Sequence, residues 1–195
     1  MPIEITQQQA ARLPFRSRYP SAKIVAWLLD HAGLLSPLEA LRAVDLTYGQ
    51  GIWWDALPQA AVAGYDNKRL PWVRRPRCFW QAPAWAWRYH IAEIEECLGG
   101  RPDIIAVDPP WQTARRGREP GGRYHYRVSR AFGSPRMILD AASIAAAYWR
   151  VPLLVHFKER WVPEGFNVVV EIWWRPFLYR ARPDYRSWWG VIGCG

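Results

Sequence analysis

The chain has 195 residues, half of them hydrophobic, and a formal net charge of +9 at neutral pH. This length suits one domain with a full hydrophobic core. No stretch reaches the roughly 18 uncharged apolar residues that a membrane helix requires, and the N-terminus lacks the basic-then-apolar layout of a signal peptide. We therefore expect a soluble, cytoplasmic protein with one domain over residues 1–195 and no membrane partner.

Arginine carries nearly all of the positive charge, because only three of the 26 basic residues are lysines. The planar guanidinium matches phosphate oxygens in a bidentate manner, and a strongly basic protein favours a polyanionic partner. The 14 tryptophans add flat rings that can stack on bases. Composition thus favours nucleic acid as the partner, with a general solubility charge as the alternative.

The three cysteines lie far apart in the sequence, at Cys78, Cys97 and Cys194, and form no CxxC pair. Such spacing predicts neither a zinc site nor a disulfide framework. No metal ligands are therefore expected.

Taken in chain order, hydrophobic periodicity and turn residues predict strands that alternate with helices. Residues 1–35 form an N-terminal helical segment, in which Ser21 is the expected N-cap and Gly33 the stop. The further predicted helices cover 51–57, 84–98 and 134–149. The predicted strands cover 41–46, 61–66, 77–80, 103–108, 151–157, 166–174 and 187–193.

This alternation predicts an α/β fold with a mostly parallel sheet. The last two strands have no helix between them, so we expect them to pair as an antiparallel C-terminal hairpin at the sheet edge. Residues 111–133 form a basic loop within the domain. Ligands of open α/β sheets bind at the carboxyl ends of the strands, which makes the strand ends the places to search for a site.

Three strand ends carry polar chemistry. The stretch "DLTYGQG" follows the first of these strands and places Gly49 and Gly51 after Asp45, where glycines allow a tight turn and close approach to a ligand. Asp66 ends the next strand, and an acid there can accept hydrogen bonds from both hydroxyls of a ribose. The strand over 103–108 ends in "DPPW", 108–111, where the prolines stop the strand.

In this order, the three motifs resemble those of the class I S-adenosylmethionine-dependent methyltransferases, specifically the amino-methyltransferases that modify N6 of adenine or N4 of cytosine in nucleic acid. The resemblance spans about residues 19 to 175 and implies a Rossmann-like fold with S-adenosyl-L-methionine as cofactor. It implies catalytic roles for Asp108, Pro109, Pro110 and Trp111. It implies cofactor-binding roles for Asp45, Thr47, Tyr48, Gly49, Gly51, Asp66, Asn67, Trp80 and Lys23.

The assignments of Lys23 and Trp80 have weaker support from the family motifs than the others. Lys23 lies in "RYPSAK", which resembles the N-terminal segment supporting the methionine end of the cofactor. The family often has an acid for the cofactor adenine at the end of the strand that corresponds to 77–80 here. In this chain "FWQAP" offers only Phe79, Trp80 and Gln81 at that place. Which residues contact the adenine therefore stays open.

The chemistry of the tetrapeptide is consistent with amine methylation. An exocyclic amine is a poor nucleophile because its lone pair is delocalised into the ring. Hydrogen bonds from this amine to the Asp108 carboxylate and the Pro109 carbonyl favour a pyramidal nitrogen, and the prolines hold that carbonyl in place. Trp111 is expected to stack on the base. Methylation at carbon 5 of cytosine is disfavoured, since it needs a cysteine nucleophile and no cysteine here follows a proline.

The basic loop is the candidate surface for nucleic acid, because arginines and aromatic residues together suit a splayed or flipped nucleotide. Its expected substrate-binding residues are Arg115, Arg116, Arg118, Arg123, Tyr124, His125 and Tyr126. The chain has no room for a separate recognition domain, which leaves short-motif DNA, structured RNA, or recognition through a homodimer or partner protein.

DNA is the first expected substrate, and the same chemistry on tRNA or rRNA is the alternative. Two further readings stay open. Methylation of a protein amide or small amine uses the same tetrapeptide, although the net charge argues against it. A non-catalytic nucleic-acid-binding protein retaining the fold is the other, although the intact motifs argue against decay.

Overall fold

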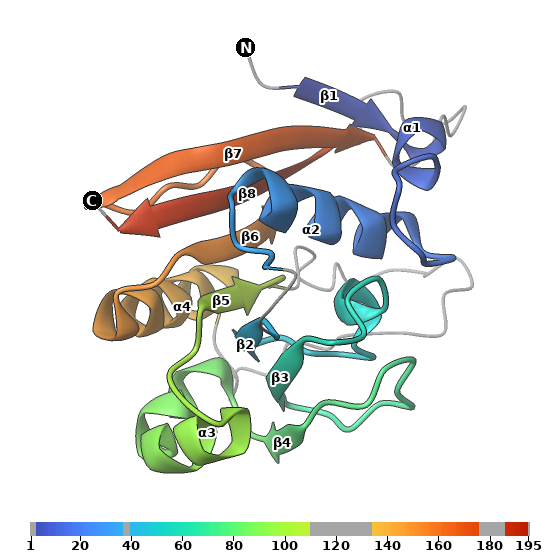
Figure 1. Ribbon diagram of the computed structural model, residues 1–195. Coiled ribbons are helices and arrows are strands. Elements are labelled where there is room, and N and C mark those ends of the chain that lie inside the picture. The colour runs from blue at the N-terminus through green and yellow to red at the C-terminus, as the bar shows by residue number, and fades with distance from the viewer. Residues whose placement is uncertain (1–2, 37–39, 110–133, 176–185, 195) are drawn as a thin grey trace, which may run out of the picture.

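The computed structural model describes residues 3–36, 40–109, 134–175 and 186–194, and the expectations for Pro110, Trp111 and the basic loop lie outside this part of the chain. Within the described residues, eight strands form one sheet in the order β1-β7-β8-β6-β5-β2-β3-β4 (Figure 1). The strands are β1 (Ile3–Thr6), β2 (Arg42–Asp45), β3 (Ala61–Asp66), β4 (Cys78–Gln81), β5 (Ile104–Val107), β6 (Leu153–Phe157), β7 (Phe166–Arg175) and β8 (Ser187–Cys194). The helices are α1 (Gln7–Ala11), α2 (Pro20–His31), α3 (Ile91–Leu98) and α4 (Pro135–Trp149), with 3₁₀ turns η1 (Ile52–Trp54) and η2 (Ala84–Tyr89).

The sheet is mostly parallel, as the sequence predicts. Every pairing among β1 to β7 is parallel, whereas β8 runs antiparallel to both β6 and β7. The expected antiparallel hairpin of β7 and β8 is therefore confirmed. One further strand, β1, pairs with β7 and lies beyond the hairpin at the edge of the sheet. Residues 1–35 thus contribute a strand as well as helices, and Ile5 of β1 is buried in the second core described below.

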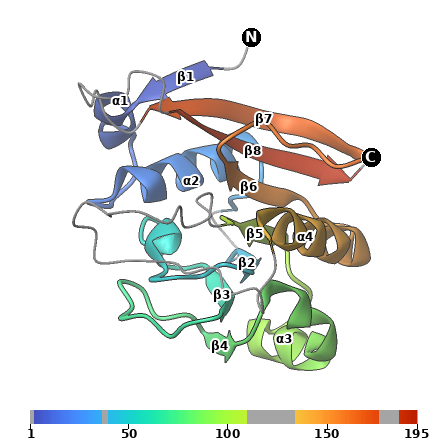
Figure 2. The same ribbon diagram turned by 180° about the vertical axis from the view of Figure 1, so that it is seen from behind.

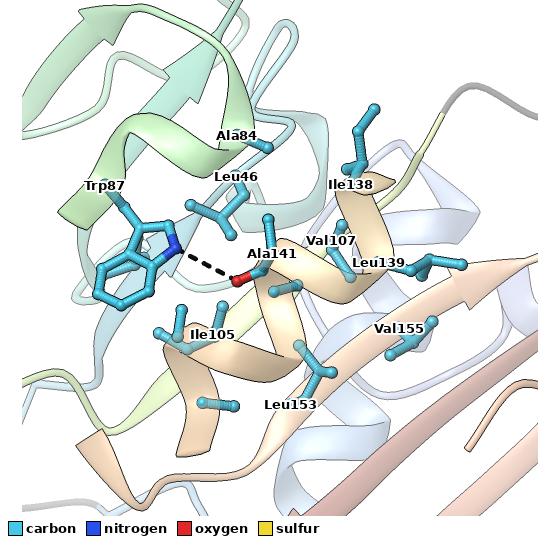
Figure 3. Packing of buried hydrophobic residues seen from close by; sticks show 14 of the residues in the cluster. Leu46, Ala84, Trp87, Ile105, Val107, Ile138, Leu139, Ala141, Leu153 and Val155 are labelled. Carbon is cyan, nitrogen blue, oxygen red and sulfur yellow. Dashed lines mark hydrogen bonds between the residues drawn. The ribbon is translucent and has the colours of Figure 1, made fainter. Parts of the chain in front are cut away.

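Helices cover both faces of the sheet, giving three layers (Figure 1 and Figure 2). One core lies between the sheet and α3, α4 and η2. In this core the Trp87 ring of η2 packs against α4 and donates its Nε1–H to the carbonyl of Ala141 at 3.2 Å (Figure 3). The second core lies between the sheet and α1, α2 and η1. Both faces are apolar, so the polar strand ends are left at the edge.

Local boundaries follow the sequence closely at α4 and less closely elsewhere. Ser134 caps α4 by accepting from the Met137 amide, as expected. The N-cap of α2 is Tyr19 rather than Ser21, because Pro20 occupies the first helical position. The helix expected over 84–98 is divided at His90, whose backbone (φ −126°, ψ 25°) separates η2 from α3. The helix expected after Gly51 is only the short turn η1.

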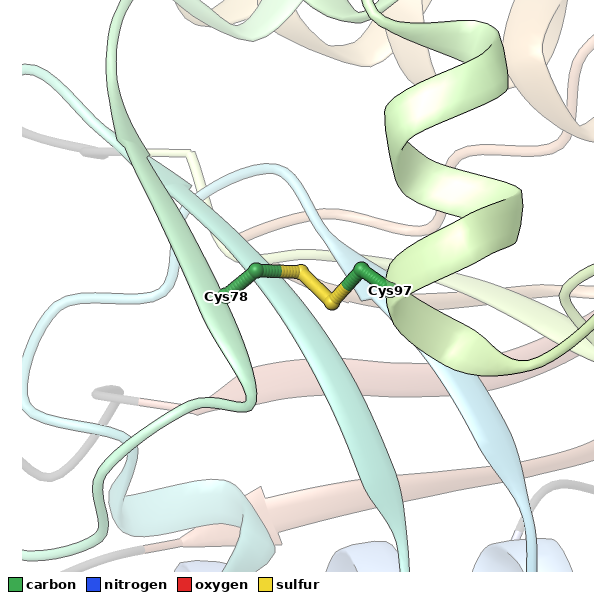
Figure 4. Close-up of a disulfide and its surroundings, with 2 residues drawn as sticks. All are labelled: Cys78 and Cys97. Carbon is green, nitrogen blue, oxygen red and sulfur yellow. A yellow bond between two sulfur atoms is a disulfide. The ribbon is translucent and has the colours of Figure 1, made fainter.

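A disulfide joins Cys78 of β4 to Cys97 of α3, with the Cα atoms 6.4 Å apart (Figure 4). The sequence predicted no disulfide framework, and this single bridge corrects that expectation. The two cysteines are 19 residues apart in the sequence and meet only because α3 packs back beside the outer strand of the sheet. In the described residues, no helix is long and apolar enough to cross a membrane.

Candidate active site

The carboxyl ends of the parallel strands bring three acids to the same edge of the sheet. Asp45 ends β2 and Asp66 ends β3, while Asp108 follows β5 directly. The strands carrying these acids are neighbours, with β2 between β3 and β5. The three strand ends that the sequence marks as polar are therefore adjacent in space, as expected for parallel strands.

Asp45 organises the turn that follows β2. It is 3% exposed, and its two carboxylate oxygens accept from the Trp54 Nε1–H at 2.8 Å and the Thr47 amide at 3.0 Å. Burial raises the pKa of Asp45 from 3.8 to about 7, and the nearby carboxylates of Asp108 and Asp66 add to this effect. Asp45 thus holds the turn and η1 together through bonds within the protein.

Tyr48 is a core residue beneath the turn. Its amide donates to the Tyr65 carbonyl at 2.8 Å, and its hydroxyl donates to the Arg74 carbonyl at 2.7 Å. Gly51 has φ +73°, and a Cβ there would lie 2.4 Å from the Tyr48 hydroxyl. The side chain of Tyr48 and the backbone of residue 74 therefore already require glycine at position 51, independently of any ligand.

Arg74 holds the segment that follows the turn, a role that no pattern in the sequence predicts. Its guanidinium donates to backbone carbonyls of Trp54, Leu57, Pro58 and Ala60. Burial lowers the pKa of Arg74. A single side chain thus fixes the path of residues 54–60 beside the candidate site.

Asp66 is bonded directly to the glycine turn. One of its carboxylate oxygens accepts from the Gly49 amide at 2.9 Å, and the other accepts from the Lys68 amide at 3.0 Å. Gly49 has φ +54°, in the left-handed region that favours glycine. Burial raises the pKa of Asp66, while the amides of Lys68, Gly49 and Asn67 oppose this effect. The structure therefore brings together Gly49, Asp66 and Asn67, three of the residues predicted to bind the cofactor.

Asp108 is held by its backbone and by its side chain. Its amide donates to the Thr47 hydroxyl at 2.6 Å, which joins the strand end of β5 to the turn after β2. Its Oδ1 lies 3.1 Å from Nδ1 of His156, and its side chain is 37% exposed. Pro109, the next residue, is buried. The carboxylate of Asp108 is thus partly open to solvent, while the backbone around it is fixed.

Two other predicted cofactor residues lie in different surroundings. The half-buried Trp80 ring of β4 stacks on Tyr65, with centroids 5.0 Å apart and planes 12° from parallel. Lys23 donates its ammonium group to the carbonyls of Ala11 at 2.7 Å and Leu13 at 3.4 Å, which ties α2 to the end of α1. Trp80 therefore packs on Tyr65, the residue directly before Asp66, whereas Lys23 contacts the backbone at the end of α1.

His156 belongs to this site, although the sequence reasoning missed it. It is the penultimate residue of β6, the strand beside β5, and is 7% exposed. Burial lowers its pKa, and the nearby Asp108 opposes this effect. The available signal was a single polar residue at the end of an otherwise apolar strand, which is the same criterion that identified the three acids.

Among the described residues, no group of three or more His, Cys, Asp or Glu side chains is arranged to hold a metal ion. The site is therefore built from carboxylates, backbone amides, hydroxyls and aromatic rings.

No protein-family model matches this chain, and no curated protein sequence matches it. Among solved structures, the catalytic domain of hMettl16 in complex with the MAT2A 3'UTR hairpin 6 is 9% identical, with a TM-score of 0.48 over 98% of this chain and 74% of that chain. Magnesium protoporphyrin IX methyltransferase (ChlM) from Synechocystis PCC 6803 with bound SAM is 15% identical, with a TM-score of 0.48 over 95% and 89%. An rRNA methylase from Streptococcus thermophilus is 9% identical, with a TM-score of 0.42 over 84% and 91%.

The strand order of the chain itself identifies the fold. From β4 to β7 the order is β4-β3-β2-β5-β6-β8-β7, with the antiparallel β8 inserted between β6 and β7. The part β4-β3-β2-β5-β6 follows the 3-2-1-4-5 strand order of doubly wound sheets, so the chain has a Rossmann-like fold.

Proposed function

We propose that this chain is an S-adenosylmethionine-dependent methyltransferase that modifies an exocyclic amino nitrogen of a nucleobase, adenine N6 or cytosine N4. The observation that carries the proposal is the hydrogen bond from the Asp108 amide to the Thr47 hydroxyl at 2.6 Å. This bond couples the DPPW strand end to the turn after β2. A carboxylate suited to an amine thus lies beside a turn suited to a nucleoside cofactor.

The residues present fit S-adenosylmethionine. The carboxylate of Asp66 has about four acceptor positions, and the backbone amides of Gly49, Lys68 and Asn67 take three of them, which leaves one for a ribose hydroxyl. The left-handed backbone of Gly49 lets the chain turn tightly beside that carboxylate. When bound, the cofactor supplies an electrophilic methyl group on a sulfonium centre. Asp66, Asn67 and the turn at Gly49 would hold it.

The acceptor side of the reaction rests on Asp108 and Pro109. The carboxylate of Asp108 can accept one N–H of the target amine, and the carbonyl of Pro109 can accept the other. Both groups follow a buried strand, the Asp108 amide is bonded to Thr47, and Pro109 is buried, which favours a preorganised pair of acceptors for the amine. In this proposal Trp111 supplies the stacking surface for the base.

Nucleic acid is the proposed substrate because of the arginine-rich net charge of +9. DNA is the first substrate to test and RNA the second. The basic loop, at 111–133, would contact the phosphates, and target recognition would involve either a second copy or a partner protein.

Incubation with methyl-labelled cofactor and separate DNA and RNA pools, followed by nucleoside mass spectrometry, tests the proposal. We expect N-methylated adenine or cytosine as product. Asp108→Ala should abolish turnover while the cofactor still binds. Trp111→Ala should weaken substrate binding by about 1–3 kcal/mol, the contribution of one stacked base, and slow turnover.

Asp103→Ala is a matched control for loss of a carboxylate. Asp103 precedes the opposite end of β5, is 34% exposed and pairs with Arg42 at 2.8 Å. This variant should retain turnover. Methyl groups on a ring carbon, or near wild-type turnover by a folded Asp108→Ala protein, would contradict the proposal.

A further inference from the structure

Asp108, His156 and Ser187 form a continuous hydrogen-bonded chain from the sheet edge into the core. Asp108 Oδ1 lies 3.1 Å from His156 Nδ1, and His156 Nε2 lies 2.8 Å from the Ser187 hydroxyl oxygen. The residues come from three neighbouring positions in the sheet, namely the end of β5, the end of β6 and the start of β8. They are 48 and 31 residues apart in the sequence, so only the fold assembles them.

This order of acid, imidazole and hydroxyl is also found in hydrolases, where an exposed serine attacks a substrate. Exposure excludes that use here. Ser187 is 0% exposed, whereas the Asp108 side chain is 37% exposed. The reachable end of the chain is therefore the carboxylate, and the hydroxyl is its buried anchor.

The imidazole ring of His156 packs against three tryptophan side chains on the α2 face of the sheet. Trp189 stacks on it with centroids 3.8 Å apart and planes 20° from parallel. Trp53 and Trp174 contact it at centroid distances of 6.0 and 6.1 Å. Such packing fixes the plane of the ring, so its two nitrogens point in set directions, toward Asp108 and Ser187.

A neutral imidazole has one nitrogen that donates and one that accepts. Burial lowers the pKa of His156 below its usual 6.5, which favours this neutral form at neutral pH. Because the Asp108 carboxylate accepts, Nδ1 must carry the hydrogen, and Nε2 then accepts from the Ser187 hydroxyl. In the part of the chain that the structure describes, Asp108 Oδ2 makes no hydrogen bond, so it is available to a ligand.

We propose that His156, oriented by Ser187, is a positioning residue that fixes the Asp108 carboxylate so that Oδ2 faces the target amine. This inference rests on the proposed function, which it deepens by naming a residue outside the DPPW tetrapeptide. His156 acts through Asp108 and does not touch the substrate. It holds the carboxylate in one orientation before the base binds. Such preorganisation lowers the activation barrier, because no group has to reorient during the reaction.

The first test is independent of activity. Nitrogen-15 NMR of the imidazole side chains distinguishes protonated from unprotonated ring nitrogens in each of the four histidines. We expect His156 to be the Nδ1–H tautomer at neutral pH, and we expect Asp108→Ala to remove that preference. An Nε2–H tautomer in the wild-type protein would overturn the inference, because Asp108 would then face a lone pair.

The second test compares turnover and cofactor affinity. His156→Phe keeps a flat ring against Trp189 but has no nitrogen, and it should lower kcat by about 10- to 100-fold, the cost of a misplaced reacting group. Its dissociation constant for S-adenosylmethionine should stay that of the wild type. His156→Asn can present an amide N–H in place of Nδ1–H and should recover part of kcat. Ser187→Ala leaves the ring in place and should lower kcat even if His156→Phe fails to fold.

His31→Phe is the matched control, because the His31 ring also stacks on a tryptophan, Trp27, with centroids 3.8 Å apart. It lies on α2 and should leave kcat unchanged. Wild-type kcat in folded His156→Phe and Ser187→Ala proteins would overturn the inference. Absence of methyl transfer by the wild-type protein would instead contradict the proposed function, while the tautomer measurement would still decide the orientation of His156.

Discussion

Replacing Trp54 with phenylalanine tests how the turn after β2 is held. Trp54 is fully buried, and its Nε1–H donates to Asp45 at 2.8 Å. Phenylalanine retains most of the ring packing but has no N–H, so the buried carboxylate loses this donor and keeps the Thr47 amide at 3.0 Å. The substitution therefore removes a bond whose strength depends on the charge of Asp45.

The expected effect depends on pH. A hydrogen bond to a charged group contributes about 1.5–3 kcal/mol and a neutral one about 0.5–1.5 kcal/mol. The loss in unfolding free energy should thus be about 1 kcal/mol larger where Asp45 is ionised than where it is protonated. This difference corresponds to a further rise in the pKa of Asp45 of about one unit in the variant.

The direction follows from proton binding. Burial raises the pKa of Asp45 in the folded state to about 7, from 3.8. The stability that Asp45 contributes is full below its pKa in the unfolded state and is lost as the pH rises through its pKa in the folded state. Between these two pKa values, the folded state binds one more proton than the unfolded state. The destabilisation by Trp54→Phe should therefore grow from about pH 5 to about pH 9.

Urea denaturation of wild type and variant at both pH values measures this difference, since other titrating groups contribute equally to both proteins. Trp87→Phe is the matched control, because the Trp87 indole is also buried but donates to the neutral carbonyl of Ala141. Its cost should be the same at both pH values. An equal cost of Trp54→Phe at both pH values would refute the assignment of Asp45 as the charged anchor of the turn.

Three further predictions concern Thr47, the disulfide and the basic loop. Thr47→Val removes the hydroxyl that accepts from the Asp108 amide, so it should cost about 1–3 kcal/mol in urea denaturation and slow methyl transfer, whereas Thr47→Ser should behave as wild type. Cys97→Ser should lower the unfolding free energy by about 3 kcal/mol, the chain-entropy value for a loop of this length closed by Cys78, and added reductant should destabilise the wild type but not the variant. Neutralising three loop arginines should reduce the salt dependence of nucleic-acid binding by about one unit of slope per phosphate contact, with unchanged cofactor affinity, and an identical slope would remove the loop from the interface. The arginines are Arg115, Arg116 and Arg118.

The strand-end acids could be predicted from the sequence because the rule that places them is local. A buried apolar run that ends in an acid predicts a carboxylate at the sheet edge, and parallel strands bring such ends together. Asp45, Asp66 and Asp108 all follow this rule, and the hydrogen bond between Gly49 and Asp66 joins two of the predicted positions.

Features that depend on distant contacts could not be predicted. The role of His156 depends on Asp108, which is 48 residues away, and its strand gives no pattern that points to that partner. The requirement for glycine at position 51 comes from Tyr48 and the backbone of residue 74, which meet it only in the folded chain. The pairing of Cys78 with Cys97 likewise needs α3 to pack beside β4.

The edge strand β1 escaped prediction for a different reason. It has four residues, and Ile5 is the buried one among them. An alternating pattern so short carries little information, since strands of this length are recognised by their partner rather than by their own sequence. Its partner, β7, lies at the other end of the chain.

Titration calorimetry of S-adenosylmethionine into the wild-type chain and into Asp66→Ala tests the central claim most directly, namely that the edge formed by Gly49 and Asp66 is a cofactor site. We expect the wild type to bind one cofactor, the Asp66→Ala protein to bind more weakly by about 1–3 kcal/mol, and Asp103→Ala to bind as the wild type does. Failure of the folded wild-type chain to bind S-adenosylmethionine, or equal affinity of folded Asp66→Ala, would contradict it.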